Sequence, residues 1–135
     1  FVCLWPETGA ALNDRNELSL VVMLEYRDFQ MLFTGDAGEY AERRILRGGA
    51  LRDVELLKVA HHGSRYSTCA EFLAVTRPEA GLISCSASNT YGHPGEETLE
   101  RLSQASCRVF VTKDCGAIRV RTDGRTVRVS GYPAR

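Results

Sequence analysis

The chain has 135 residues, of which 44% are hydrophobic and 25% are charged, so it can bury a core of ordinary size as a single domain. It carries 17 Lys and Arg against 17 Asp and Glu, so overall charge gives no argument for a polyanionic partner. No apolar run reaches the roughly 18 to 20 residues that cross a bilayer and the first residues lack a signal-peptide pattern, so we expect a soluble piece.

The first half of the chain predicts a hairpin, a helix and a buried strand. A short turn at Arg27-Asp28 joins two strands. The helix that follows should bury Ala41, Ile45 and Leu46 on one face, and Gly48-Gly49 should end it. In chain order, we expect strands over residues 1–5, 18–26 and 29–34, a helix over 39–47 and a strand over 54–60.

The second half alternates helices with strands and closes with another hairpin. Thr68 and Glu71 have the spacing of a capping box, which predicts a helix that ends before Pro78. Pro94 is predicted at the first position of a further helix. Asp123-Gly124 predicts a type I′ hairpin turn. We expect Phe72, Leu73 and Val75 on the apolar side of the first helix, a strand over 80–86, a helix over 96–104 with Leu99 and Leu102 buried, and strands over 108–112, 117–122 and 126–130.

Metal-ligating side chains follow two of the predicted strands. Asp36 comes after the strand over residues 29–34, and His61 and His62 come after the strand over 54–60. Strand ends are held by the core, so these groups should meet at one edge of the sheet and bind a divalent metal. Adjacent residues point in opposite directions, so one histidine would bind the metal while the other contacts substrate or supports the site. From the residues alone, either His61 or His62 can be the ligand.

A second group of candidates surrounds these ligands. His93 lies just before a predicted helix, whose free N–H groups can hold a phosphate while the imidazole donates a proton to an oxygen of the substrate. Asn89 and Tyr91 should line the same loop. The hydroxyl of Ser64 either reaches a phosphate oxygen or caps its own turn. Lys58 is unusual in a buried strand, where we expect it to pair with a neighbouring carboxylate.

Arginines alternate with apolar residues in the closing hairpin. Arg119, Arg121 and Arg128 should point to one side, and the valines and Ile118 to the other. Such a face either follows a nucleic-acid backbone or protects an edge strand from aggregation. The five cysteines have no C-x-x-C spacing, so we expect mainly buried free thiols, with one pair, such as Cys107 with Cys115, as the alternative in an oxidising compartment.

Taken in order, these segments resemble the metallo-β-lactamase superfamily, and within it the extracytoplasmic domain of the ComEC-type competence proteins. The resemblance implies an α/β fold, the C-terminal half of an αββα sandwich with a mixed sheet, flanking helices and a C-terminal hairpin. It also implies a position outside a bacterial cell membrane, as part of a larger membrane protein. The residues that carry the resemblance are 4–6, 16–21, 32–36, 57–64, 89–94 and 115–118.

One departure from the superfamily concerns the metal. Its members carry an upstream His-x-His-x-Asp-His motif, whereas this chain has only three histidines and no such cluster. The resemblance implies two divalent ions, zinc or manganese, in a complete domain, bridged by Asp36, and it favours His62 over His61 as the nitrogen ligand. A chain without the motif lacks most of the ligands of these ions. Asn16 or Glu17 stands where many relatives have a further metal-binding histidine.

The function that the resemblance implies is metal-dependent hydrolysis of DNA during natural transformation, with a metal-activated water as the nucleophile. The implied partners are DNA, the remainder of the same metallo-β-lactamase domain and a membrane channel domain. Two alternatives stay open: a hydrolase of lactams, thioesters or phosphocholine esters, and a catalytically silent module that binds DNA or the channel through its arginines. A half sandwich would expose the face that its other half covers, so we also expect self-association of this chain.

Overall fold

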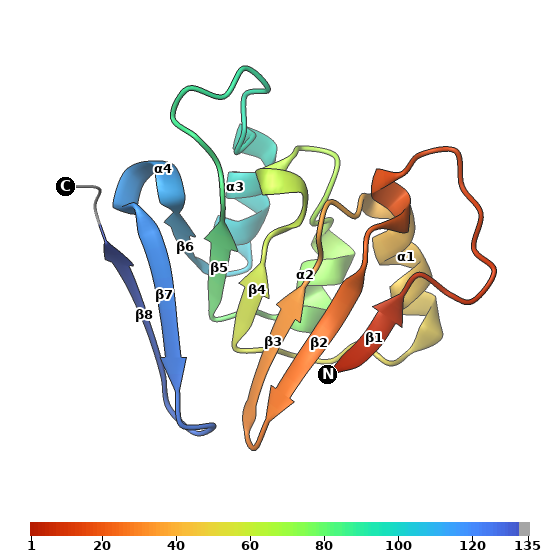
Figure 1. Cartoon of the computed structure of the whole chain (residues 1–135), viewed down its shortest axis with the longest axis horizontal. Helices are drawn as coiled ribbons and strands as arrows, with labels where there is room; N and C mark the ends of the chain where they lie inside the picture. The colour runs from red at the N-terminus through yellow and green to blue at the C-terminus, as the bar shows by residue number, and fades with distance from the viewer. Residues whose placement is uncertain (133–135) are drawn as a thin grey trace.

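The structure is a computed structural model that describes residues 1–132, and a six-stranded mixed sheet forms its centre (Figure 1). The strands lie in the order of the sequence. The first three are antiparallel neighbours, and the third to the sixth are parallel. They are β1 (Val2–Trp5), β2 (Val21–Tyr26), β3 (Phe29–Phe33), β4 (Leu56–Lys58), β5 (Ala80–Ile83) and β6 (Arg108–Val111).

Helices cover one face of this sheet. Ile45, Phe72 and Leu102 come from three different helices and pack with Leu32 and Leu57 of the sheet in one buried cluster. Parallel strands need such crossover connections, and each crossover contributes an apolar helix face to the core. The helices are α1 (Glu39–Gly48), α2 (Ala70–Thr76) and α3 (Glu96–Gln104), with a short α4 (Thr112–Cys115) and 3₁₀ turns η1 (Asn16–Leu18) and η2 (Ala60–Gly63).

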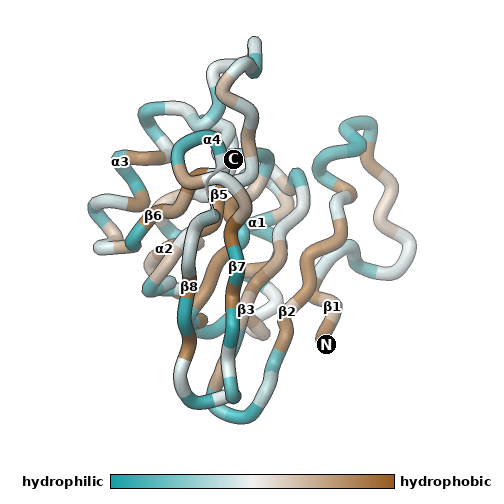
Figure 2. The backbone as a smooth tube through the Cα atoms, turned by 60° about the vertical axis from the view of Figure 1, so that its left-hand side comes forward, coloured by the Kyte–Doolittle hydropathy of each residue, from teal (hydrophilic) through white to brown (hydrophobic). Residues whose placement is uncertain are grey.

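A two-stranded hairpin packs on the opposite face. It consists of β7 (Ala117–Thr122) and β8 (Val127–Tyr132). Its side chains alternate along each strand, and Figure 2 shows the hairpin in front of the sheet with alternating apolar and polar positions. The chain is therefore an α/β structure with helices on one side of a mixed sheet and a hairpin on the other. The α/β class, the mixed sheet, the flanking helices and the closing hairpin were expected, but the place of the hairpin was not predicted. The inward residues Ile118, Val120, Val127 and Val129 pack with Phe29, Met31, Leu56 and Leu82.

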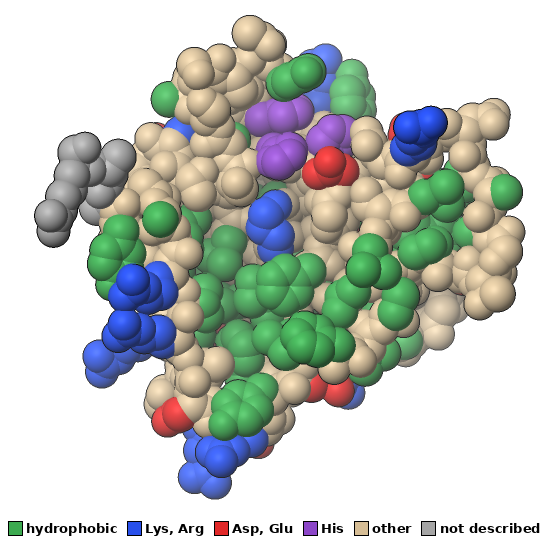
Figure 3. Space-filling view, viewed as in Figure 1, with side chains coloured by type: hydrophobic (Ala, Val, Ile, Leu, Met, Phe, Trp, Pro, Cys, Tyr) green, Lys and Arg blue, Asp and Glu red, His purple; other side chains and the backbone are tan. Residues whose placement is uncertain are grey.

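The hairpin leaves part of its sheet face open. Phe1 is 85% exposed, Leu20 is 59% exposed and Phe33 is 37% exposed. These three side chains line an apolar hollow of about 630 Å³ that extends to Lys58 and the strand ends. Figure 3 shows this apolar surface below the histidines, between the hairpin and the first strands. Within residues 1–132, no other element covers it.

The predicted helix boundaries were largely confirmed, and the three strands β2, β4 and β5 are shorter than expected. Strand β5 ends at Ile83, although a strand over residues 80–86 was predicted. Helix α1 ends where Gly49 adopts a left-handed conformation, with φ of 68°. Strand β2 begins only at Val21, because η1 occupies the preceding residues. Strand β4 spans Leu56–Lys58, because the chain turns sharply at His61 and His62. Helix α4 was not predicted.

The local signals at three turns were wrong. Thr68 does not cap α2, whose N-cap is Cys69, and it donates its N–H to Glu42 instead. Pro94 precedes the N-cap of α3 and lies outside the helix. Between β7 and β8 the loop is four residues long, since Thr122 pairs with Val127, so the two-residue turn is not formed.

Burial predictions had mixed outcomes. Val75 of α2 is 38% exposed although an apolar position was expected, whereas Phe72 and Leu73 are buried. All five cysteines are free thiols, as expected, and the alternative pairing of Cys107 with Cys115 is not formed. Only Cys69 and Cys107 are buried, so the expectation of mainly buried thiols was wrong. Among residues 1–132, no helix combines the length and the hydropathy that crossing a membrane requires.

Candidate metal and substrate site

Three loops meet where the parallel strands β3, β4 and β5 end at the same edge of the sheet (Figure 1). Backbone hydrogen bonds connect the loops to one another. His61 donates its N–H to the carbonyl oxygen of Gly35 at 3.0 Å, and Gly95 donates its N–H to the carbonyl oxygen of Gly63 at 2.9 Å. Gly63 has φ of 82°, and a Cβ atom there would lie 2.7 Å from Cβ of Pro94, so only glycine allows this contact. The three loops thus form one rigid platform.

Asp36 and His62 face each other on this platform. Nε2 of His62 lies 3.6 Å from Oδ1 of Asp36, and both side chains are partly exposed, 48% and 42% respectively. Nδ1 of His62 lies 2.6 Å from the carbonyl oxygen of Ser84, which can only accept, so Nδ1 carries a proton. Nε2 of the neutral ring is therefore the atom with the free lone pair. The hydroxyl of Ser19 accepts the backbone N–H of Asp36 at 3.1 Å and so helps to position Asp36.

The donor chemistry of this pair fits a divalent ion. An imidazole nitrogen and a carboxylate oxygen that both bind one zinc ion at about 2.1 Å, with tetrahedral geometry, lie about 3.4 Å apart. The observed 3.6 Å is close to that separation. Among residues 1–132, however, no third His, Cys, Asp or Glu side chain joins the two. The chain thus supplies two donors of a site that needs four.

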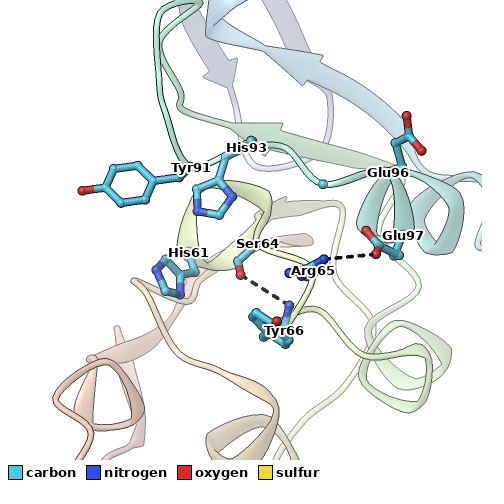
Figure 4. Close-up of a pocket in the computed structure, with 10 residues that line it drawn as sticks. His61, Ser64, Arg65, Tyr66, Tyr91, His93, Glu96 and Glu97 are labelled. Atoms are coloured by element: carbon cyan, nitrogen blue, oxygen red, sulfur yellow. Dashed lines mark hydrogen bonds and ion pairs between the residues drawn. The ribbon is translucent and has the colours of Figure 1, made fainter.

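The two adjacent histidines point to different places. His61 and His62 both adopt left-handed conformations, with φ of 48° and 55°. His62 faces Asp36, whereas the ring of His61 lies 5.7 Å from the ring of His93 at an interplanar angle of 61°. That the two adjacent side chains point in different directions was predicted, and the metal-binding role of either histidine stays a prediction. The structure places His61 beside His93, in the lining of a cavity of about 580 Å³ (Figure 4).

The loop after β5 holds His93 over this cavity. Asn89 donates its side-chain amide to the carbonyl oxygen of His93 at 2.9 Å and accepts the N–H of His93 at 2.9 Å. Tyr91 stacks on the imidazole of His93, with 5.9 Å between ring centroids and an interplanar angle of 17°. Partial burial lowers the pKa of His93, and the charges of the other two histidines lower it further. Asn89 thus shapes the loop, and Tyr91 is the more exposed of the two predicted substrate residues.

Ser64 and Lys58 have structural partners. Ser64 is only 3% exposed, and its hydroxyl accepts the N–H of Tyr66 at 3.3 Å, which favours the role of a turn residue. Lys58 donates from Nζ to the carbonyl oxygen of Val59 at 2.8 Å. Burial lowers the pKa of Lys58, and the negative charge of Asp36 opposes this change. Within the described part of the chain Lys58 makes no ion pair, so the predicted carboxylate partner was wrong.

The arginines of the hairpin lie apart from the strand ends. Arg119 and Arg121 are exposed on the outer side of β7, as predicted. Arg119 stacks on Tyr132 with 4.4 Å between the guanidinium carbon and the ring centroid. In Figure 3, basic side chains gather over the hairpin while the histidines gather at another edge. The structure does not bring the two groups together.

Three residues that organise the site were not predicted as such. Glu17 accepts the N–H of Ala41 at 2.9 Å and so caps α1, which gives this position a structural role. Arg101 of α3 donates to the carbonyl oxygens of Arg65, Ser67 and Thr68, which fixes the loop after the histidines. Glu42 of α1 accepts the N–H groups of Thr68 and Cys69 in the loop before α2. Each of these contacts is long-range, so no local sequence signal reveals it.

Comparison with known proteins adds a family context. The chain is 34% identical over 133 residues, 98% of its length, to ComE operon protein 3 of Bacillus subtilis. It is 32% identical over 120 residues, 89% of its length, to Recombination protein 2 of Haemophilus influenzae. It is 30% identical over 121 residues, 88% of its length, to Competence protein ComA of Neisseria gonorrhoeae.

These relatives are much longer than the chain. The matched segments make up 17%, 15% and 17% of the three proteins, so the chain spans about a sixth of their length. The names of the relatives indicate a family of competence proteins. No family model matches the chain.

Proposed function

We propose that this chain is part of a metallo-β-lactamase-like hydrolase domain that degrades DNA in a ComEC-like competence protein. The observation that carries the proposal is the pair formed by Nε2 of His62 and Oδ1 of Asp36, two metal-donor atoms 3.6 Å apart at the ends of adjacent parallel strands. Similarity to competence proteins over 98% of the chain supports DNA as the substrate. The remaining ligands would come from other parts of a longer protein, and its place outside the cell membrane and its channel partner belong to the same proposal.

The residues of this chain would prepare the site for hydrolysis. When bound, divalent zinc or manganese ions lower the pKa of a coordinated water and stabilise negative charge on a phosphate. His62 is already fixed in the tautomer that offers Nε2, because Ser84 accepts the proton of Nδ1. Asp36 offers a second oxygen that could bridge two ions. His93 is held by Asn89 at the far side of the histidine turn, where it can donate a proton to a substrate oxygen.

The decisive experiment measures DNA cleavage by the intact protein that contains this chain. Single-stranded and duplex DNA are incubated with Mn²⁺ or Zn²⁺, and Asp36→Asn and His62→Gln are compared with the unaltered protein. Each change removes one donor, so we expect cleavage to fall by more than about 100-fold. Asp28→Asn is the matched control, because Asp28 is an exposed carboxylate in the turn between β2 and β3.

Two further outcomes would replace the proposal. Hydrolysis of a β-lactam, thioester or phosphocholine ester without cleavage of DNA would show a different hydrolase on the same site. The exposed arginines of the hairpin favour the second candidate, a silent DNA-binding module. Salt-sensitive binding of DNA that depends on Arg119 and Arg121, with no cleavage in either metal, would establish that module.

A further inference from the structure

Two tyrosines at the cavity beside His61 are highly exposed. Tyr91 is 82% exposed and Tyr66 is 69% exposed. Both line the cavity of about 580 Å³, a volume within the usual range of small-ligand sites (Figure 4). Exposed aromatic rings that border a cavity offer a flat apolar surface with a polar tip, as in binding sites for planar ligands.

Each ring has a neighbouring side chain on one of its faces. Tyr91 stacks on His93 with an interplanar angle of 17°. The guanidinium carbon of Arg65 lies over the ring of Tyr66, 5.0 Å from its centroid. Nη1 of Arg65 lies 4.0 Å from Oε1 of Glu97. One face of each tyrosine ring therefore lies against a neighbouring side chain, and the other face is free to stack on a ligand. A ligand that stacks on such a ring orders few additional side chains, which lowers the entropic cost of binding.

The charge of the lining favours a base over a phosphate. Arg65 contributes one positive charge, and Glu96 and Glu97 contribute two negative charges, so with neutral imidazoles the formal sum is 1 − 2 = −1. This balance gives a phosphate no net attraction to the lining. Carboxylate oxygens accept hydrogen bonds, however, and the exocyclic amino group of a nucleobase donates them.

We propose that this cavity binds an unpaired nucleobase, so that the substrate enters as single-stranded DNA. The proposal rests on the proposed function, because it names the class of DNA that the same site takes. His61 lines the cavity and the adjacent His62 faces Asp36, so base and phosphate sites lie next to each other along the chain. Bases within a duplex are paired and stacked, and their faces are not available to a tyrosine.

The test measures binding without hydrolysis. The full chain is titrated in EDTA into a fluorescent single-stranded oligodeoxycytidine, and binding is followed by fluorescence anisotropy. We expect Tyr66→Ala and Tyr91→Ala each to weaken binding at least about fivefold, the effect of losing one stacked base. Tyr66→Phe and Tyr91→Phe keep the ring and should bind as the unaltered chain does. An abasic strand of equal charge should bind more weakly and respond to neither tyrosine.

A matched control is available in β2. Arg27 lies over Tyr26, 5.3 Å from its centroid, in the same arrangement as Arg65 over Tyr66, and Tyr26 is 45% exposed. Tyr26→Ala should leave binding unchanged. Circular dichroism of each variant establishes that loss of binding is not loss of folding.

Several results would overturn the inference. One is failure of the chain to bind the single strand, and another is binding of the abasic strand or of a duplex as tightly as the single strand. Binding that depends on Arg121 but on neither tyrosine would also contradict the inference. Because EDTA prevents metal-dependent cleavage, the two proposals can fail separately. Tyrosine-dependent binding with no nuclease activity in metal would remove only the proposed function, and cleavage indifferent to both tyrosines would remove only this inference.

Discussion

The carboxylate of Glu42 in α1 accepts the backbone N–H of Thr68, which lies in the loop before α2. It also accepts the N–H of Cys69 at 2.8 Å, and Glu42 is only 1% exposed. Burial raises the pKa of Glu42 to about 7, and the two N–H donors oppose this change. Thr68 has φ of 58° and its buried hydroxyl has no partner among the described residues, so this carboxylate holds a loop that is otherwise unfavourable.

This carboxylate predicts a pH dependence of stability. The folded state binds the proton of Glu42 more tightly than the unfolded state, so the stabilising contribution is complete below pH 4.5 and is lost as pH rises to about 7. The expected loss is about 3 kcal/mol, since one pKa unit corresponds to 1.36 kcal/mol. Urea unfolding at pH 4 and pH 8 measures this loss. Glu42→Gln should remove this slope, whereas Glu100→Gln on the exposed side of α3 should retain it.

Glu17 is predicted to stabilise α1 without taking part in chemistry. Its carboxylate accepts the N–H of Ala41, one of the donors that an α-helix leaves unpaired at its start. Glu17→Ala should lower the free energy of unfolding by about 1 kcal/mol, and Glu17→Gln, which keeps an acceptor oxygen, should cost less. Thermal unfolding checks both values. A role of Glu17 in metal binding would instead appear as weaker Mn²⁺ or Zn²⁺ affinity of the folded Glu17→Gln variant.

Arg101 is predicted to fix the loop that follows the histidines. Its guanidinium donates hydrogen bonds to the carbonyl oxygens of Arg65, Ser67 and Thr68. A lysine ammonium lacks the planar fork that reaches several acceptors, so Arg101→Lys should lower stability by about 1 to 3 kcal/mol. Chemical unfolding is the measurement, with Arg47→Lys in the last turn of α1 as the exposed control. Equal stabilities of the two variants would contradict this role.

The open apolar surface predicts that the chain associates with itself. Leu20 and Phe33 are 59% and 37% exposed beside the apolar hollow. Sedimentation at rising concentration should show oligomers, and Phe33→Arg should shift them towards the monomer because a charge then lies in the contact. Val75→Arg is the control, since Val75 is 38% exposed on the helical side. A monomer at every concentration would argue against association through this face.

The sequence predicted most of the fold because its signals were local. Apolar alternation and glycine located α1, the hairpin of β7 and β8 and the strand ends that carry Asp36 and His62. The metallo-β-lactamase assignment, the extent of the domain, the catalytic role of His93 and the metal ions remain predictions.

What could not be predicted depends on contacts between distant segments. Thr68 looked like a helix cap, but its N–H is taken by Glu42, which is 26 residues away in sequence. The turn at His61 and His62 uses left-handed conformations that neither side chain prefers. Periodicity indicated that the two rings would diverge, but not that His61 would meet His93.

The parallel arrangement of β3, β4 and β5 places both donor atoms at one edge of the sheet and the far ends of the crossover connections at the other edge. Asp36 and His62 are anchored by neighbouring strands, whereas α1 and α2 connect those strands across the face of the sheet that the helices cover. Insertions in the far ends of these crossovers would lengthen a surface loop without moving either donor atom. Homologous chains can therefore diverge widely there while keeping the same spacing between carboxylate and imidazole.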